Sequence, residues 1–345
     1  MDNSGLSRIN QLKEVRLNWC MASRILINDV TLREGDQTLA VPFTIEDKIL
    51  IARKLDALGV HQIQAGWPAR KPEDRDIMHR LRDAGVRARL EAVVPIYGKN
   101  WQEEVAATIA SAPDVVDLMH PASDIRIQVL KTTRTDALGR VRDSLNYAKG
   151  AGICLRLALI DATRADLAFL KDMAAQAVEA GAERIGVADT AGAILPAGMA
   201  YLVREIAQVA RVPIQVHAHN DFGLALANTL AALEAGASIA DVSINGLGER
   251  AGNVSLDELV VVLQTLYSQP LGIRTEGLYD LSQVVARIAN VPIPPMKPLM
   301  GEDAFVHKLA MHRTFAQIDP RSYETIDPKT IGRPQHSSFP PGGMA

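Results

Sequence analysis

One pattern recurs along most of this chain: a short run of β-forming residues, a turn, and then an amphipathic helical stretch. Eight β-rich runs follow one another, at residues 24–32, 61–67, 88–95, 115–121, 153–161, 184–190, 213–220 and 239–246. The gaps between them hold helical patterns with apolar residues at i, i+3, i+4 and i+7, such as IEDKILIARKLDALG and LAFLKDMAAQAVEAG. Strands that alternate with helices predict a parallel sheet.

Glycines mark the ends of several of these helical stretches. A glycine at that position supplies the left-handed stop that lets the chain turn into the next strand. The glycines in question are Gly59, Gly85, Gly152, Gly181 and Gly236. Eight strand–helix units predict a closed (β/α)8 TIM barrel over residues 24–268. The alternative is an open doubly wound sheet, but the first βα turn lacks the glycine-rich dinucleotide fingerprint typical of that fold.

The repeat does not extend to the ends of the chain. Residues 1–23 are expected to be an N-terminal extension, helical or disordered, without the apolar core of a signal peptide. Residues 269–333 are expected to form a small, mainly helical C-terminal lid subdomain, in which prolines break the chain after the helical pattern TEGLYDLSQVVARIANV. Residues 334–345 are expected to be a disordered tail.

Composition excludes several classes of partner and location. The formal charge is −3, with acidic and basic residues interspersed, so neither nucleic acid nor an anionic membrane is an expected partner. No apolar stretch approaches the ~20 residues of a membrane span. Cys20 and Cys154 lie far apart and form no metal or redox motif, which suits a reducing cytosol. We therefore expect a cytoplasmic protein, with Cys154 as a small core residue.

Polar residues collect where the predicted strands end, which is where a barrel of this kind places its active site. His217 and His219 are two residues apart, so their side chains emerge on the same face of a strand. With Glu34 they can form a two-histidine, one-carboxylate metal site with open positions, and Asn253 is a candidate further ligand. The alternative is a pair of hydrogen-bonded histidines at the rim.

Arg33 adjoins the proposed ligand Glu34. Its planar, permanently charged side chain suits a carboxylate or a developing enolate or alkoxide. The alternative is a salt bridge from Arg33 to Asp29 or Asp36. The glycines of GLGERAGN (246–253) are expected to let the backbone approach a negatively charged CoA or carboxylate closely.

These motifs together resemble a known family. DVTLREGDQ, AGWPA, VADTAG, HAHNDFGLALANTLAALEAGA and NGLGERAGN, in this order, are similar to the acyl-CoA condensing enzymes of the DRE-TIM metallolyase superfamily. That group includes homocitrate, isopropylmalate and citramalate synthases. The resemblance covers residues 24–333, and FVHKLAMHR and SYETIDPKTIGR look most like the lid of homocitrate synthase.

The resemblance implies a set of roles for individual residues. A divalent metal (Mg, Mn or Zn) would be held by Glu34, His217 and His219. The 2-oxo acid would lie beside the catalytic Arg33, and acetyl-CoA would be the cosubstrate. Further contacts to substrate would come from Gln37, Arg156, Thr190 and His307. Proton transfer would fall to His312 and Tyr323 on the lid, which would enter the partner subunit's site in a homodimer.

Three segments depart from the family pattern. The strand-five serine and the acid–base glutamate are replaced by Ala158 and Ile160, Leu39-Ala40 stands where Pro-Gly is usual, and a strand-four histidine is replaced by Arg126. Losing one acid–base partner typically costs ~10²–10⁴ in rate.

Arg156 stands where homocitrate synthases place the arginine that holds the distal carboxylate of 2-oxoglutarate. Together with Arg126 it favours a 2-oxo acid with a second anionic group. The alternative is that Arg156 pairs with Asp161 or Asp189 as structure.

The sequence thus predicts an acyltransferase that joins acetyl-CoA to a 2-oxo acid such as 2-oxoglutarate. The alternatives are condensation with another 2-oxo acid, as in isopropylmalate, citramalate or phosphonomethylmalate synthases, and a related lyase, whose hydroxymethylglutaryl-CoA type uses a cysteine that GLGERAGN lacks. A non-haem iron oxygenase and a non-catalytic binding paralogue are also alternatives. In non-haem iron oxygenases, however, the pair of histidines normally lies in an antiparallel double sheet, which the alternation of strands and helices excludes.

Overall fold

A computed structural model describes residues 21–22, 24–39, 41 and 43–334. Most of the predicted N-terminal extension, including Cys20, and almost all of the predicted tail lie outside the described residues.

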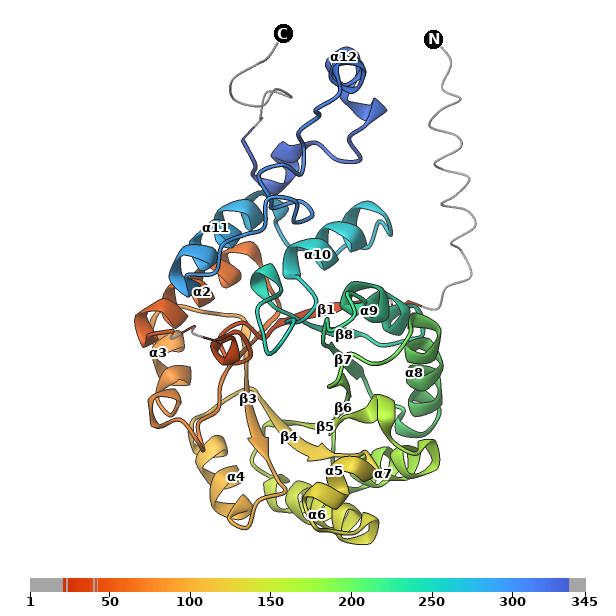
Figure 1. The fold of residues 1–345 in the computed structure, drawn as a ribbon. Coiled ribbons are helices and arrows are strands. Elements are labelled where there is room, and N and C mark those ends of the chain that lie inside the picture. The colour runs from red at the N-terminus through yellow and green to blue at the C-terminus, as the bar shows by residue number, and fades with distance from the viewer. Residues whose placement is uncertain (1–20, 23, 40, 42, 335–345) are drawn as a thin grey trace.

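Eight strands close into one barrel in which every paired strand runs parallel to its neighbours, with the last strand hydrogen-bonded to the first (Figure 1). The strands are β1 (Leu26–Asp29), β2 (Gln62–Gly66), β3 (Arg89–Pro95), β4 (Val115–Pro121), β5 (Cys154–Ile160), β6 (Arg184–Asp189), β7 (Ile214–Ala218) and β8 (Ile239–Val242). All eight predicted runs contain one of these strands. The predicted TIM barrel is confirmed, and the described residues form neither an open sheet nor an antiparallel double sheet.

Helices surround the barrel and connect successive strands (Figure 1). They are α2 (Ile45–Leu58), α3 (Ile77–Asp83), α4 (Trp101–Ala110), α5 (Asp124–Val129), α6 (Arg134–Ala148), α7 (Leu167–Ala180), α8 (Pro196–Ala210), α9 (Ala225–Glu234) and α10 (Leu256–Thr265). The glycines predicted to stop helices all have positive φ, between 73° and 117° for Gly59, Gly85, Gly152, Gly181 and Gly236. The predicted helix stops are confirmed at or directly after the helix cap for four of them, whereas Gly152 lies beyond Lys149, the residue that caps α6.

The strands β1, β7 and β8 end two to four residues before the predicted runs do, because the chain leaves the sheet at the barrel mouth. After β1 the backbone N–H groups of Arg33 and Glu34 both donate to the carbonyl of Val30, at 3.1 and 2.7 Å. This turn leads into a short 3-10 helix, η1 (Gly35–Gln37). After β7, His219 lies just beyond the strand and bridges to Asn253. The residues predicted as strand ends therefore form the loops that build the site.

The C-terminal part beyond the barrel is helical, as predicted. It contains α11 (Leu278–Ala289) and α12 (Ala310–Ile318), joined and followed by short irregular segments. Buried Arg333 ties these segments together, because its guanidinium donates to the carbonyls of Leu299, Gly301 and Glu302. In Figure 1, α12 projects away from the barrel beyond α10 and α11.

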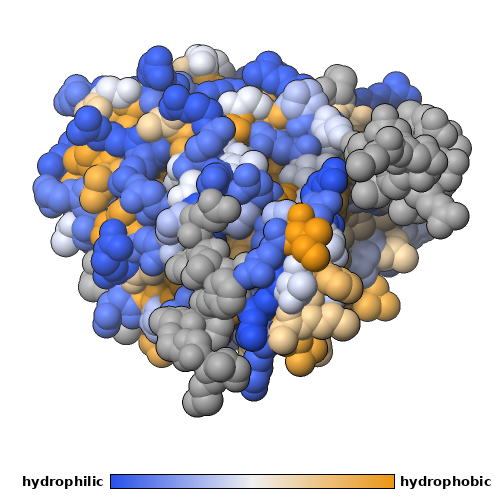
Figure 2. Space-filling view, turned by 90° about the horizontal axis from the view of Figure 1, so that it is seen from above, coloured by the Kyte–Doolittle hydropathy of each residue, from blue (hydrophilic) through white to orange (hydrophobic). Residues whose placement is uncertain are grey.

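The projecting part carries exposed apolar side chains. Viewed from above, apolar and hydrophilic residues alternate over this side of the molecule (Figure 2). The exposed large apolar residues on and beside α12 are Leu309, Met311, Phe315 and Ile318. Among the residues that the structure describes, none of the helices combines the length and the apolar character needed to cross a bilayer.

Candidate active site and metal centre

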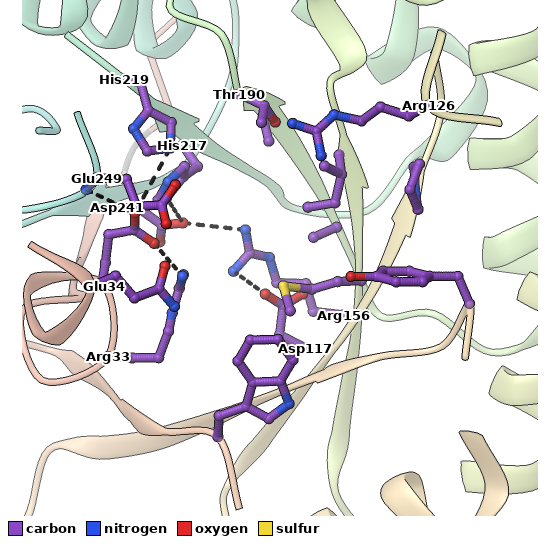
Figure 3. A pocket seen from close by; sticks show the side chains of 18 of the residues that line it. Arg33, Glu34, Asp117, Arg126, Arg156, Thr190, His217, His219, Asp241 and Glu249 are labelled. Carbon is purple, nitrogen blue, oxygen red and sulfur yellow. Dashed lines mark hydrogen bonds and ion pairs between the residues drawn. The ribbon is translucent and has the colours of Figure 1, made fainter. Parts of the chain in front are cut away.

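A cavity of about 380 Å³ opens at the carboxyl ends of the strands (Figure 3). Seven of the residues predicted to act in the site line it: Arg33, Glu34, Gln37, Arg156, Thr190, His217 and His219. They come from β1, β5, β6 and β7 and the loops that follow them. The structure therefore brings together residues that are as much as 186 positions apart in the sequence, from 33 to 219.

Glu34, His217 and His219 form a compact group of potential metal ligands. One ligand atom from each lies within 4.8 Å of the other two, and all three side chains are buried. The two imidazole rings are 5.0 Å apart between centroids, and His219 Nε2 lies 3.9 Å from Glu34 Oε1. Two imidazoles and one carboxylate at this spacing can hold a divalent ion with open positions left for substrate.

The protonation states of this group suit a metal. Burial, followed by the neighbouring His217, lowers the pKa of His219 to about 4, so the ring is neutral at pH 7. Burial opposes ionisation of Glu34, but Arg33 and the two histidines hold its pKa below the usual value. A neutral imidazole and an ionised carboxylate are the forms in which these side chains bind metals.

Buried polar atoms without partners also point to a ligand at this place. His219 Nδ1 and Asn253 Oδ1 are buried and have no hydrogen-bond partner among the residues that the structure describes. Buried polar atoms are normally paired, so such exceptions call for an explanation. Asn253 does not line the main cavity, but its bridge to His219 keeps it beside the metal group. The residues present fit a divalent ion.

The glycines of GLGERAGN allow close contacts within the protein. A Cβ on Gly248 would lie 2.5 Å from Asn253 Nδ2, and one on Gly252 would lie 1.9 Å from the Gly246 carbonyl oxygen. Gly252 also has φ of 81°. Both glycines thus allow the loop to fold tightly behind the metal group.

Arg33 faces the cavity and is held by two neighbours. Its Nε donates to Gln64 Oε1 at 2.6 Å, and its Nη1 forms an ion pair with Glu34. The alternative pairing with Asp29 or Asp36 is wrong, because Asp29 accepts from the Thr31 backbone and Asp36 pairs with lysines.

Arg156 lies at the floor of the cavity among three carboxylates. Its guanidinium nitrogens are 3.0 Å from Glu91, 3.1 Å from Asp117 and 3.3 Å from Asp241 (Figure 3 shows the last two pairs). The alternative pairing with Asp161 or Asp189 is therefore wrong.

Asp241 and Asp117 are functional candidates that the sequence analysis missed. Asp241 Oδ2 lies 3.2 Å from His217 Nδ1, which orients the ring of a proposed metal ligand. Burial raises the pKa of Asp117 to about 7, although Arg156 opposes the rise. The available signal was an aspartate inside an otherwise apolar strand, in VVDLM and IADVS.

Thr190 and Arg126 stand on the other side of the cavity (Figure 3). Thr190 Oγ1 accepts a hydrogen bond from the Asp161 backbone at 2.8 Å. Arg126 Nε lies 3.7 Å from Asp161 Oδ2, and 41% of the Arg126 side chain is exposed. The replaced family positions, Ala158 and Ile160, also line the cavity.

The three lid residues cluster with one another and not with the cavity. The ring centroids of His312 and Tyr323 are 4.4 Å apart, and that of His307 lies 5.3 Å from Tyr323 and 6.3 Å from His312. None of the three is among the described residues that line the cavity. Within one chain, therefore, the lid residues do not reach the metal group.

Fold and site together define a (β/α)8-barrel protein with a two-histidine, one-carboxylate centre at the mouth. The chain belongs to the HMGL-like family, whose model matches residues 24–285. This confirms the resemblance drawn from the sequence.

Relatives carry synthase names. Homocitrate synthase AksA of Methanothermobacter thermautotrophicus is 40% identical over 321 residues, which are 93% of this chain and 81% of that protein. A probable 2-isopropylmalate synthase of Methanopyrus kandleri is 39% identical over 313 residues, 90% of this chain and 62% of that protein. A putative (R)-citramalate synthase CimA of Methanosphaerula palustris is 40% identical over 306 residues, 88% of this chain and 60% of that protein.

Solved structures share the fold. Hydroxymethylglutaryl-CoA lyase of Pseudomonas aeruginosa superposes with a TM-score of 0.69 at 22% identity, covering 79% of this chain and 95% of that one. The carboxyl transferase domain of Rhizobium etli pyruvate carboxylase gives 0.65 at 19% identity, covering 82% of this chain and 49% of that one. At such identities the likeness establishes the barrel alone.

Removing a ligand should abolish metal binding. We expect calorimetry with Mn²⁺ to give one tight site per chain, weakened by more than about 100-fold in His217→Ala and in Glu34→Gln, since losing an outer-shell partner alone costs about 10–100-fold. His79→Ala, which removes an exposed histidine on α3, is the matched control and should bind as the unmodified protein does. Unchanged affinity in His217→Ala would contradict the assignment.

Proposed function

We propose that this protein is an acyl-CoA:2-oxo acid acyltransferase that condenses acetyl-CoA with a 2-oxo acid and releases CoA and a 2-hydroxy acid with two or more carboxylates. The observation that carries the proposal is the group formed by Glu34, His217 and His219 beside Arg33 in the barrel mouth. Its support from outside the structure is a family whose relatives are named as homocitrate, isopropylmalate and citramalate synthases.

Glu34, His217 and His219 would hold a divalent cation (Mg, Mn or Zn), which would supply Lewis-acid polarisation of the 2-oxo group. Arg33 lines the same cavity, and its guanidinium stabilises the negative charge that develops on the carbonyl oxygen. Gln37 and Thr190 lie in the lining as contacts for the substrate carboxylate. The hydrogen bond from Arg33 to Gln64 limits the motion of the guanidinium before substrate arrives.

His312 and Tyr323 are the proposed proton-transfer groups, with His307 as a further substrate contact. A base in this cluster removes a proton from the methyl carbon of acetyl-CoA. That carbon then forms a bond to the carbonyl carbon of the 2-oxo acid, and the carbonyl oxygen takes up a proton to become a hydroxyl group. Water then cleaves the thioester to give a carboxylate and the CoA thiol.

A homodimer would explain why His307, His312 and Tyr323 lie away from the cavity of their own chain. The cluster lies on a part of the chain that projects from the barrel, and α12 carries exposed apolar side chains beside it (Figures 1 and 2). Such a surface favours association with a second copy, whose cavity the three residues would complete. This arrangement is part of the proposal.

The remaining features of the proposal concern location and partners. We place the protein in the cytoplasm, with small molecules as substrates and with neither nucleic acid nor membrane as partner. The near-neutral, interspersed charge supports this. Cys154, expected in the core, is only half-buried; burial raises the pKa of its thiol, and it lies outside the described cavity lining.

Release of the CoA thiol tests the proposed reaction directly. With acetyl-CoA, a panel of 2-oxo acids and Mn²⁺, we expect thiol release with at least one 2-oxo acid, and loss of that release on adding a chelator. Restoring the metal should restore the rate, because the ion is held by side chains that remain in place. Thiol release that a chelator leaves intact, or no release with any member of the panel, would contradict the proposal.

Mixing two inactive variants tests whether the lid serves the partner's site. His217→Ala and His312→Gln should each be nearly inactive as homodimers. After mixing under conditions that exchange subunits, half of the dimers contain one of each, and one site in each mixed dimer is complete, so about a quarter of the unmodified activity should return. A mixture that stays inactive although mixed dimers form would show that the lid acts within its own chain.

A further inference from the structure

The charge of Arg156 is already matched within the protein. Its side chain is only 2% exposed, and it pairs with Glu91, Asp117 and Asp241 at 3.0–3.3 Å. Gly186 on β6 makes room for it, since a Cβ there would lie 2.7 Å from the guanidinium. A buried guanidinium surrounded by three carboxylates has little attraction left for a fourth anion.

Glu91 is one of the three carboxylates that neutralise the charge of Arg156. It lies on β3, fully buried, and does not line the cavity, so its charge faces Arg156 and not the substrate. The side chains of Gln62 and Gln64 donate to its two oxygens at 2.6 and 2.5 Å, and Asn28 donates to it at 3.3 Å. These hydrogen bonds and the pair with Arg156 fix the Glu91 carboxyl group in place beneath the floor.

Above this floor the wall between β4 and β5 is apolar. The two parallel strands pair Asp117 with Arg156, Met119 with Ala158, and Pro121 with Ile160. Because alternate residues of a strand share a face, these three pairs form successive layers from floor to mouth, and all six residues line the cavity. Two apolar layers thus separate the charged floor from the mouth.

We propose that Glu91 is a specificity-determining residue: by neutralising Arg156 beneath the apolar layers, it makes the site select 2-oxo acids whose side chain is uncharged and apolar. This inference rests on the proposed condensation reaction and names the class of its 2-oxo acid. It replaces the expectation, drawn from Arg156 and Arg126, of a second anionic group.

The physical reason is the cost of burying a carboxylate without a free cation. A distal carboxylate lying against the wall loses its water beside Met119, Ala158 and Ile160, and the floor beneath offers it more anions than cations. Arg126 does not compensate at that depth, because it belongs to α5 at the mouth, is 41% exposed and already faces Asp161. An apolar side chain gains from the same wall.

The unmodified protein provides the first test. With acetyl-CoA and Mn²⁺, kcat/KM for 3-methyl-2-oxobutanoate should exceed that for 2-oxoglutarate by at least about 100-fold, as expected when a buried group lacks its partner. A preference for 2-oxoglutarate overturns the inference and leaves the proposed reaction standing. If no 2-oxo acid is turned over, the proposed function fails, and calorimetric binding of the same two acids to the Mn²⁺-loaded protein still decides the inference.

The Glu91→Gln variant provides the second test. Removing one negative charge leaves Arg156 with two carboxylates, so kcat/KM for 2-oxoglutarate relative to 3-methyl-2-oxobutanoate should rise by about tenfold, mainly through KM for the dicarboxylate. Glu179→Gln, which makes the same change on the exposed face of α7, should leave the ratio unaltered. A folded Glu91→Gln protein with an unaltered ratio would overturn the role of Glu91; if the variant does not fold, the ranking of the two acids by the unmodified protein decides.

Discussion

The buried carboxylate of Asp241 joins the metal group to the floor of the cavity. It accepts hydrogen bonds from Gln215 at 2.5 Å and Asn28 at 2.7 Å, and it pairs with both Arg156 and His217. Burial opposes ionisation of Asp241, but Arg156 and His217 hold its pKa below the usual value. A buried charge is stable only when it is paired and hydrogen-bonded in this way. The partners of Asp241 come from β1, β5 and β7, so these strands must keep one relative arrangement.

The hydrogen bonds and ion pairs of Asp241 have two consequences, one for the proposed metal site and one for the floor of the cavity. On one side, Asp241 occupies Nδ1 of His217, which sets the orientation of the ring and leaves Nε2 for a metal. On the other side, the same carboxylate helps to neutralise Arg156, as Glu91 does. If both proposed roles hold, metal binding and the choice of 2-oxo acid would be coupled through side chains that are buried in the barrel interior. We expect substitutions in the network to disturb both.

The sequence predicted the fold and much of the site, for identifiable reasons. Strand–helix periodicity is a local signal, so the barrel could be read directly, and polar residues at strand ends marked the mouth. The ion-pair partners of a charged side chain, in contrast, cannot be inferred from the neighbouring sequence. Whether Arg156 meets substrate or carboxylates depends on residues as far away as Glu91 and Asp241, which only the closed barrel brings together. The ends of β1, β7 and β8 were predicted too far along the chain, because tertiary contacts and not local composition decide where a chain leaves the sheet.

The proposed chemistry requires a single divalent ion at Glu34, His217 and His219. Diffraction from a crystal soaked with Mn²⁺, measured at a wavelength where manganese scatters anomalously, would test this most directly. We predict one strong anomalous peak per chain at the barrel mouth, within bonding distance of one oxygen of Glu34 and one nitrogen of each histidine. A peak elsewhere, or none there while the ion binds the protein in solution, would contradict the account.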